Sequence, residues 1–162
     1  MRFPYQLFVC LLLFSAGWTA CSSNANEHPE HQRAVAWNEG AVEINKSLKK
    51  KVKELEEENE DLEEVVTRKG VPEPEVLRRL QDHQALVADY RGVIKKHELL
   101  IEQNEENIDR HENEPLGADE ITSIHEQIYR NFITIQQDAA RINEEIDGYL
   151  ALYESLSRDY PT

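Results

Sequence analysis

The chain is poor in the residues that disulfide-rich and all-β domains need. Its 162 residues include only two cysteines, six glycines and six prolines. Two cysteines cannot make a disulfide framework or a four-thiolate zinc site. A β-sandwich or barrel would need many more turn residues. The abundant Glu, Leu, Ile, Gln and Asn instead indicate an all-α protein, and the length favours a single domain.

Basic residues are also scarce. The chain has 18 Lys plus Arg against 32 Asp plus Glu, which gives a formal net charge of −14 at pH 7. A surface of this charge repels a phosphate backbone, so we do not expect nucleic-acid binding. No Ser-His-Asp arrangement, glycine-rich phosphate loop or paired buried carboxylate stands out, and we therefore predict that the protein is not an enzyme.

Apolar runs are missing except near the N-terminus. The run from Leu7 to Ala16 is preceded by one positive side chain, Arg2. Ten residues in a helix span about 15 Å, which is roughly half of the hydrocarbon core of a bilayer. The run is therefore typical of a signal peptide, which we place at residues 1–20 and expect to be removed.

The residues that follow resemble the lipobox of bacterial lipoprotein precursors. In that family, small residues precede a cysteine that becomes the acylated first residue of the mature protein. The segment Trp18-Thr19-Ala20-Cys21 fits this pattern at its last three positions. The resemblance implies that diacylglycerol and an N-terminal acyl chain such as palmitate modify Cys21 and bind it to the lipid bilayer. Ser22 after the cysteine implies forwarding to the outer membrane.

Cysteine usage favours acylation over the alternative of ordinary signal-peptide cleavage. That alternative arises because Trp18 stands where the family prefers an aliphatic residue, and cleavage after Gly17 would also follow small residues. However, Cys10 lies in the segment that is removed. Cys21 would then be a lone thiol in an oxidising compartment unless it carries a lipid.

Heptad patterns dominate the rest of the chain. Residues 21–34 are small and polar without periodicity, which predicts a flexible tether. In residues 35–158, apolar side chains recur with a seven-residue repeat, which predicts three helices at about 35–68, 74–112 and 118–157. Short connections make neighbouring helices antiparallel. We therefore expect an up-down-up antiparallel three-helix bundle with coiled-coil-like heptads.

Polar residues interrupt these apolar seams at heptad spacing. Pairing the helices about their loops places Asn59 level with His83, Asn45 with His97, and Asn104 with Trp37 and His125. Buried polar residues that pair in this way fix the register of packed helices. We therefore predict polar core layers formed by Asn45, Asn59, His83, His97, Asn104, His111 and His125.

The histidines do not predict a metal site. Four of them are spaced by 14 residues, namely His83, His97, His111 and His125. Consecutive ones on a single helix lie about 21 Å apart, so they cannot share an ion. Asparagine, expected opposite two of them, is a poor ligand for a transition metal. His28 and His31 fall in the expected tether, where they would bind a metal only loosely. We expect no cofactor beyond the lipid on Cys21.

The sequence thus favours a non-enzymatic, lipid-anchored protein of the outer membrane that faces the periplasm or the cell exterior. There it would act as a scaffold or interaction module for another envelope protein. Two alternatives stay open: a periplasmic binder of metal or haem that uses the histidine layers, and a coiled-coil homo-oligomer or chaperone-like clamp. A further hypothesis is a pH response, because charging buried histidines below about pH 6 loosens their packing.

Overall fold

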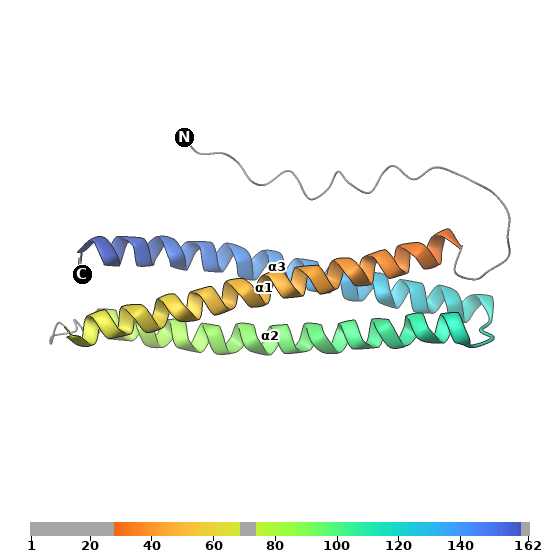
Figure 1. Ribbon diagram of the computed structural model, residues 1–162, viewed down its shortest axis with the longest axis horizontal. Coiled ribbons are helices and arrows are strands. Elements are labelled where there is room, and N and C mark those ends of the chain that lie inside the picture. The colour runs from red at the N-terminus through yellow and green to blue at the C-terminus, as the bar shows by residue number, and fades with distance from the viewer. Residues whose placement is uncertain (1–27, 69–73, 160–162) are drawn as a thin grey trace, which may run out of the picture.

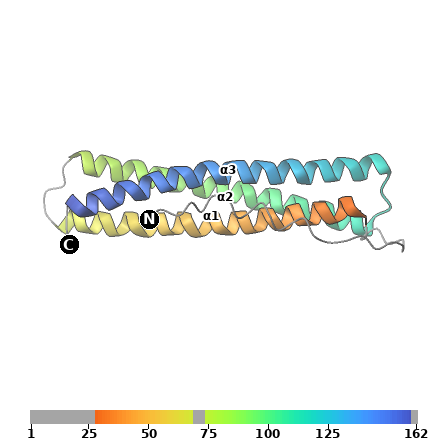
Figure 2. The same cartoon turned by 90° about the horizontal axis from the view of Figure 1, so that it is seen from above.

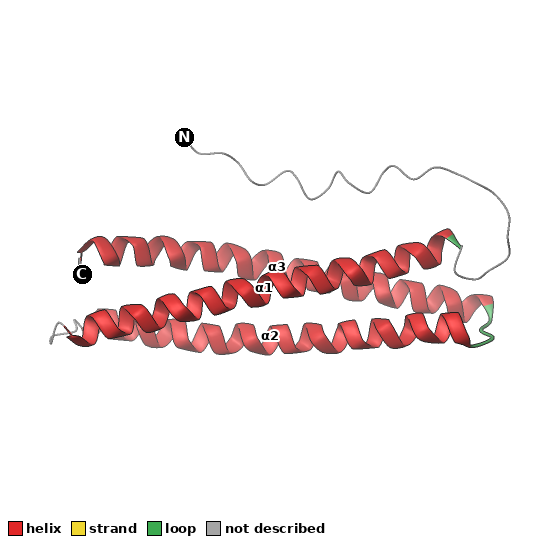
Figure 3. Ribbon diagram, in the orientation of Figure 1, coloured by secondary structure: helices red, strands yellow, loops and turns green. Residues whose placement is uncertain are grey.

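Three long helices make up the part of the chain that the structure describes. The computed structural model describes residues 28–68 and 74–159. They form α1 (Pro29–Arg68), α2 (Pro74–Asn113) and α3 (Ala118–Asp159). α1 and α3 run in the same direction and α2 runs against both, as Figures 1 and 2 show. The prediction of an all-α, up-down-up three-helix bundle is confirmed (Figure 3).

The start of α1 follows from its first residues. The carbonyl oxygen of His28 accepts the first helical hydrogen bond, from the N–H of Gln32 at 3.1 Å. Pro29 takes the next position, where a residue without an N–H group is tolerated. Glu30 lies beside it, near the positive end of the helix dipole. His28 is therefore the N-cap of a helix that begins well before residue 35.

This start corrects the expected boundary of the tether. Residues 29–34, which composition assigned to the tether, are helical. Within them, His31 is 3% exposed and Ala34 is fully buried against the other helices. Their packing against α2 and α3 stabilises the extra turns. Such packing cannot be inferred from the composition of the segment. The expected signal peptide and Cys21 lie outside the described residues.

Two apolar clusters fill the space between the helices. The larger one lies in the middle of the bundle and toward the α1–α2 connection, and it includes Leu48, Leu55, Tyr90, Ile142 and Ile146. The smaller one, at the other end, is formed by Ala34, Ile124 and Ile128. Full burial of one Leu or Ile side chain contributes about 1.5–3 kcal/mol, so the heptad seams supply most of the stability.

The register between α1 and α2 is the one expected from the sequence, whereas the register between α2 and α3 differs from the expected one. Asn45 lies level with His97, as expected, because their side chains are 3.2 Å apart. Asn104, however, pairs with Asn131 and not with His125, which instead contacts His111. The expected pairing assumed that the two helix ends joined by the α2–α3 loop lie at the same level. Packing of the small apolar cluster instead sets their stagger, which differs from the expected one by nearly a heptad.

The outer faces of the helices are charged. Ion pairs join turns of α1, as between Lys53 and Glu57, and join neighbouring helices, as between Lys49 and Glu98. Exposed pairs of this kind contribute roughly 0–1 kcal/mol each and chiefly keep the surface soluble. None of the helices in the described ranges combines the length and apolar character that crossing a membrane requires.

Candidate metal centre at one end of the bundle

Buried polar side chains recur along the helices of the bundle. All seven residues expected in polar layers belong to this set, and the structure adds His31, Asn38 and Asn107. Each of the following is less than one tenth exposed: His31, Asn38, Asn45 and Asn59 on α1, His83, His97, Asn104, Asn107 and His111 on α2, and His125 on α3. Apart from Asn107, the spacing on α1 and on α2 is seven residues or a multiple of it, so these side chains lie along one face of each helix.

His97 forms the layer nearest the middle of the bundle. Its Nδ1 lies 3.2 Å from Oδ1 of Asn45, and its Nε2 lies 3.4 Å from Oδ2 of Asp138 on α3. Burial lowers the pKa of His97. Asp138 opposes this shift and the positive charge of Lys96 adds to it. The ring is therefore neutral at pH 7, and both of its nitrogens have polar neighbours.

Two further layers hold hydrogen bonds between α2 and α3. The side-chain amide of Asn131 donates to Oδ1 of Asn104 at 2.8 Å. The hydroxyl of Tyr90 donates to Oε2 of Glu145 at 2.7 Å, and this bond holds the pKa of Glu145 below its usual range. Other buried atoms of the layers, Nδ2 of Asn104 and Oδ1 of Asn38, have no hydrogen-bond partner among the described residues.

Nearest the α1–α2 connection, the layer of Asn59 and His83 has an aromatic neighbour. The rings of His83 and Tyr149 meet edge-on with their centroids 4.4 Å apart. Tyr149 offers no ligand nitrogen at this level. In the described ranges, only one group of histidine, cysteine and acidic residues is close enough to hold a metal ion, and it lies at the opposite end of the bundle.

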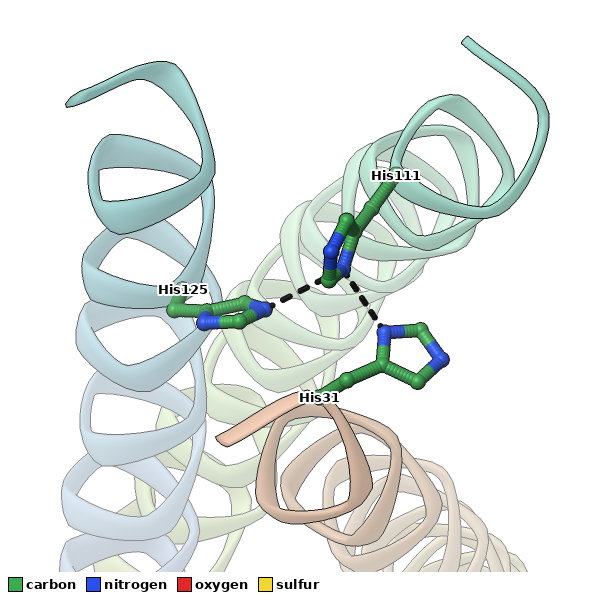
Figure 4. A group of neighbouring side chains, drawn as sticks. All are labelled: His31, His111 and His125. Carbon is green, nitrogen blue, oxygen red and sulfur yellow. Dashed lines mark hydrogen bonds between the residues drawn. The ribbon is translucent and has the colours of Figure 1, made fainter. Parts of the chain in front are cut away.

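That group consists of three histidines, one from each helix. His31 lies in the first turn of α1, His111 in the last turn of α2, and His125 near the start of α3. One ring nitrogen of each lies within 4.8 Å of the other two. Figure 4 shows the three rings turned toward a common centre, with both drawn contacts ending on His111. We call this group the histidine triad.

Carboxylates behind two of the rings set which nitrogen carries the proton. Oε1 of Glu112 lies 3.0 Å from Nε2 of His31, so that Nε2–H donates to it. Oε2 of Glu30 lies 4.0 Å from Nδ1 of His125 and favours a proton there by its charge. In both rings the nitrogen that faces the centre is then left with a lone pair. Carboxylates stand behind metal-binding histidines in the same way.

Protons alone cannot satisfy the centre of the triad. Nδ1 of His111 lies 2.8 Å from Nδ1 of His31 and 3.3 Å from Nε2 of His125. A neutral ring nitrogen holds either one proton or one lone pair. With lone pairs on the other two rings, three nitrogens share at most the one proton of His111. His125 Nδ1 has no hydrogen-bond partner among the described residues either. The arrangement is costly for buried groups.

A metal ion fits the same arrangement. Tetrahedral zinc binds nitrogen at about 2.0–2.1 Å, which places ligand nitrogens about 3.3 Å apart. The separations from Nδ1 of His111 to the nitrogens of His31 and His125, 2.8 and 3.3 Å, are close to this value. Burial lowers the pKa of His111 and of His125, and the charges of neighbouring histidines lower both further. Both rings are therefore neutral at pH 7, as metal ligands must be.

A groove between α1 and α3 reaches one member of the triad, His125. It has a volume of about 210 Å³, and its lining includes Arg33, Trp37, Tyr129 and His125. The rings of Trp37 and Tyr129 contact each other with centroids 4.9 Å apart. The lining also includes Glu30, whose carboxylate faces Nδ1 of His125.

The heptad spacing of polar residues indicates that His31 belongs to the bundle, although the composition of the surrounding residues indicates a tether. Counting back from Asn45 in steps of seven gives Asn38 and then His31, which continues the polar series of α1. The polar appearance of residues 21–34 concealed this continuation. The expected stagger of α2 and α3 then placed Asn104, rather than His111, beside His125.

Comparisons with protein-family models, with curated proteins and with solved structures find no match to this chain. The function is therefore inferred from the residues of the chain itself.

We predict that acid destabilises the bundle partly through His97. In the unfolded chain a histidine has a pKa of about 6.5, and burial lowers that of folded His97. The unfolded state thus takes up a proton first, and stability is lost as the pH falls through this range. In metal-free buffer, His97→Gln should show a smaller drop in melting temperature between pH 7.5 and 5.5 than the parent protein. Equal drops would contradict the prediction.

Proposed function

We propose that this protein binds one divalent transition-metal ion of the zinc class at the end of a lipid-anchored helical bundle. One observation carries the proposal: ring nitrogens of three buried histidines, His31, His111 and His125, all lie within 4.8 Å of one another, and two of the separations are 2.8 and 3.3 Å. Imidazole nitrogens favour zinc, copper and nickel ions over the hard cations Ca²⁺ and Mg²⁺. A transition-metal ion replaces the shared proton and bonds to all three rings.

The geometry supports a metal ion better than haem. Haem needs a flat cavity wide enough for the porphyrin, with its axial ligands on opposite faces. Here His31 and His111 are in direct contact, with ring centroids 4.6 Å apart, and His111 and His125 are 4.9 Å apart. Rings packed this closely leave no room for a porphyrin, whereas a single ion fits between their nitrogens.

The proposed anchor places the metal site close to the membrane along the chain. Cys21 is the expected acylation site, and His31 follows it by ten residues. Two or three acyl chains on one residue are sufficient for stable attachment, since each buried CH₂ contributes about 0.8 kcal/mol. The lipobox resemblance supports attachment to the outer membrane, with the bundle facing the periplasm or the cell exterior.

A second candidate function is that of a scaffold or interaction module in the cell envelope. The observation that favours it is the shape of the bundle: helices of 40 to 42 residues extend for about 60 Å, with charged outer faces. Such a rod can hold a partner protein at a fixed distance from the membrane. Metal binding and scaffolding are compatible, because the triad occupies only one end of the rod.

We predict a single metal site in the purified full-length protein. Titration with Zn²⁺, followed by calorimetry, should give one equivalent bound with a dissociation constant below about 1 µM. His111→Gln and His125→Gln should each weaken binding by at least about 100-fold, because two nitrogen ligands cannot replace three. His97→Gln is the matched control, since it removes a buried histidine outside the triad. Binding weaker than micromolar, or equal losses in all three variants, would refute the site.

Glu112 provides a finer test of the same centre. Its carboxylate accepts the Nε2–H of His31 and thereby leaves Nδ1 free to bind the ion. Loss of such a partner typically weakens metal binding by about 10–100-fold. Glu112→Gln should therefore lower the affinity for Zn²⁺ by about this factor, with unchanged helical content by circular dichroism. Glu106→Gln, on an exposed part of α2, should have no effect.

The anchor is tested by metabolic labelling. Cells that express the protein and are fed a palmitate analogue should incorporate it, and Cys21→Ala should abolish the label because Cys21 is the proposed site of acylation. His111→Gln, which changes only the metal site, serves as the control and should be labelled normally. Unchanged labelling of Cys21→Ala would show that the lipid is not attached there.

A further inference from the structure

The polar layer next to the histidine triad is made of asparagines. It lies between two places where α1 contacts α2, namely the triad itself and the pair of Asn45 and His97. Asn38 is seven residues from the α1 member of each contact, and Asn104 is seven residues from the α2 member of each. Because the two helices are antiparallel, Asn38 and Asn104 lie at the same level, about 10 Å along the bundle from the triad.

Each of these two asparagines has one buried polar atom without a partner. Asn38 is 7% exposed and Asn104 is fully buried. Oδ1 of Asn38 and Nδ2 of Asn104 have no hydrogen-bond partner among the described residues. The other polar atom of Asn104, Oδ1, accepts the bond from Asn131 of α3, which fixes the orientation of its amide. The two remaining atoms carry the full cost of lost hydration unless another molecule bonds to them.

The chemistry of the two atoms selects the ligand. Oδ1 of Asn38 can only accept a hydrogen bond, and Nδ2 of Asn104 can only donate one. The carbonyl oxygen repels an anion, and the amide protons repel a cation. A neutral molecule that accepts one bond and donates another satisfies both atoms, and water is the smallest such molecule. Buried waters occupy sites that offer at least two polar partners, as this layer does.

The neighbours of Asn38 on α1 are short. Ala34 and Ala41 lie one turn before and one turn after it on the same face of the helix, and both are fully buried. Their methyl groups take up less of the space between the helices than the side chains of Leu48 and Leu55 further along α1. The α1 side of this layer therefore suits a molecule of the size of water.

We propose that the layer of Asn38 and Asn104 binds one buried water molecule. The water accepts a hydrogen bond from Nδ2 of Asn104 and donates one to Oδ1 of Asn38. Together with the bond from Asn131 to Asn104, this arrangement carries hydrogen bonds from α3 through α2 to α1 at a single level. The inference does not depend on metal binding, because the site shares no residue with the triad.

Nuclear magnetic resonance of the full-length protein tests the site, in metal-free buffer and again with Zn²⁺. The side-chain amide protons of Asn104 should show a nuclear Overhauser cross-peak to a long-lived water molecule in both buffers. Asn38→Leu removes the acceptor but keeps a side chain that branches at the same carbon, and it should abolish the cross-peak. Asn59→Leu, which removes a buried asparagine from another layer of α1, is the matched control and should leave it unchanged.

The parent protein alone can overturn the inference, whether or not Asn38→Leu folds, if its Asn104 amide shows no cross-peak to water. A cross-peak that survives in Asn38→Leu, or one lost equally in Asn59→Leu, would also overturn it, because the water would then not depend on Oδ1 of Asn38. A shift of the Asn104 amide resonances when chloride replaces sulfate would overturn it in favour of an anion. A parent protein that shows the cross-peak and binds no Zn²⁺ would contradict the metal proposal and support this one.

Discussion

The bundle depends on the rule that a buried polar side chain needs a polar partner. α1 carries buried polar residues at most of its heptad positions, and short contacts join Asn45 to His97 and His31 to His111 on α2. Sliding α1 by one heptad would place Asn45 against Tyr90 and Val52 against His83. Such mismatches leave buried nitrogens and oxygens without partners, at about 1–3 kcal/mol each. The polar layers therefore select one register, while the apolar seams supply the stability.

Much of this fold follows from the sequence. The seven-residue repeats and the glycines and prolines between them predict three helices, and the α1–α2 loop correctly aligns Asn45 with His97. Two features could not be predicted. The start of α1 depends on the burial of His31 and Ala34 against helices distant in sequence. The stagger of α3 depends on how Ile124 and Ile128 pack, which the position of the loop does not determine.

The same limits explain why the candidate metal centre was missed, although two of its three residues were expected in polar layers. His111 and His125 were placed at different levels, and His31 was placed outside the bundle. The triad also differs physically from the other layers. His97 finds an amide and a carboxylate, and Oδ1 of Asn104 accepts a hydrogen bond from Asn131, while Nδ2 of Asn104 has no partner among the described residues. The triad brings three nitrogens together with too few protons between them, and conflicts of this kind mark functional sites more often than structural ones.

The position of the triad also bears on how the bundle responds to mechanical load. The chain enters α1 at the end where His31 meets the other helices, and an anchor upstream of residue 28 would pull there. Tension on that segment would act first on the first turn of α1, where His31 contacts His111 and Glu112 of α2. Metal–nitrogen bonds at this point would join the first turn of α1 to α2 and α3. The resistance of this end of the bundle to a pull would then depend on whether the centre holds an ion.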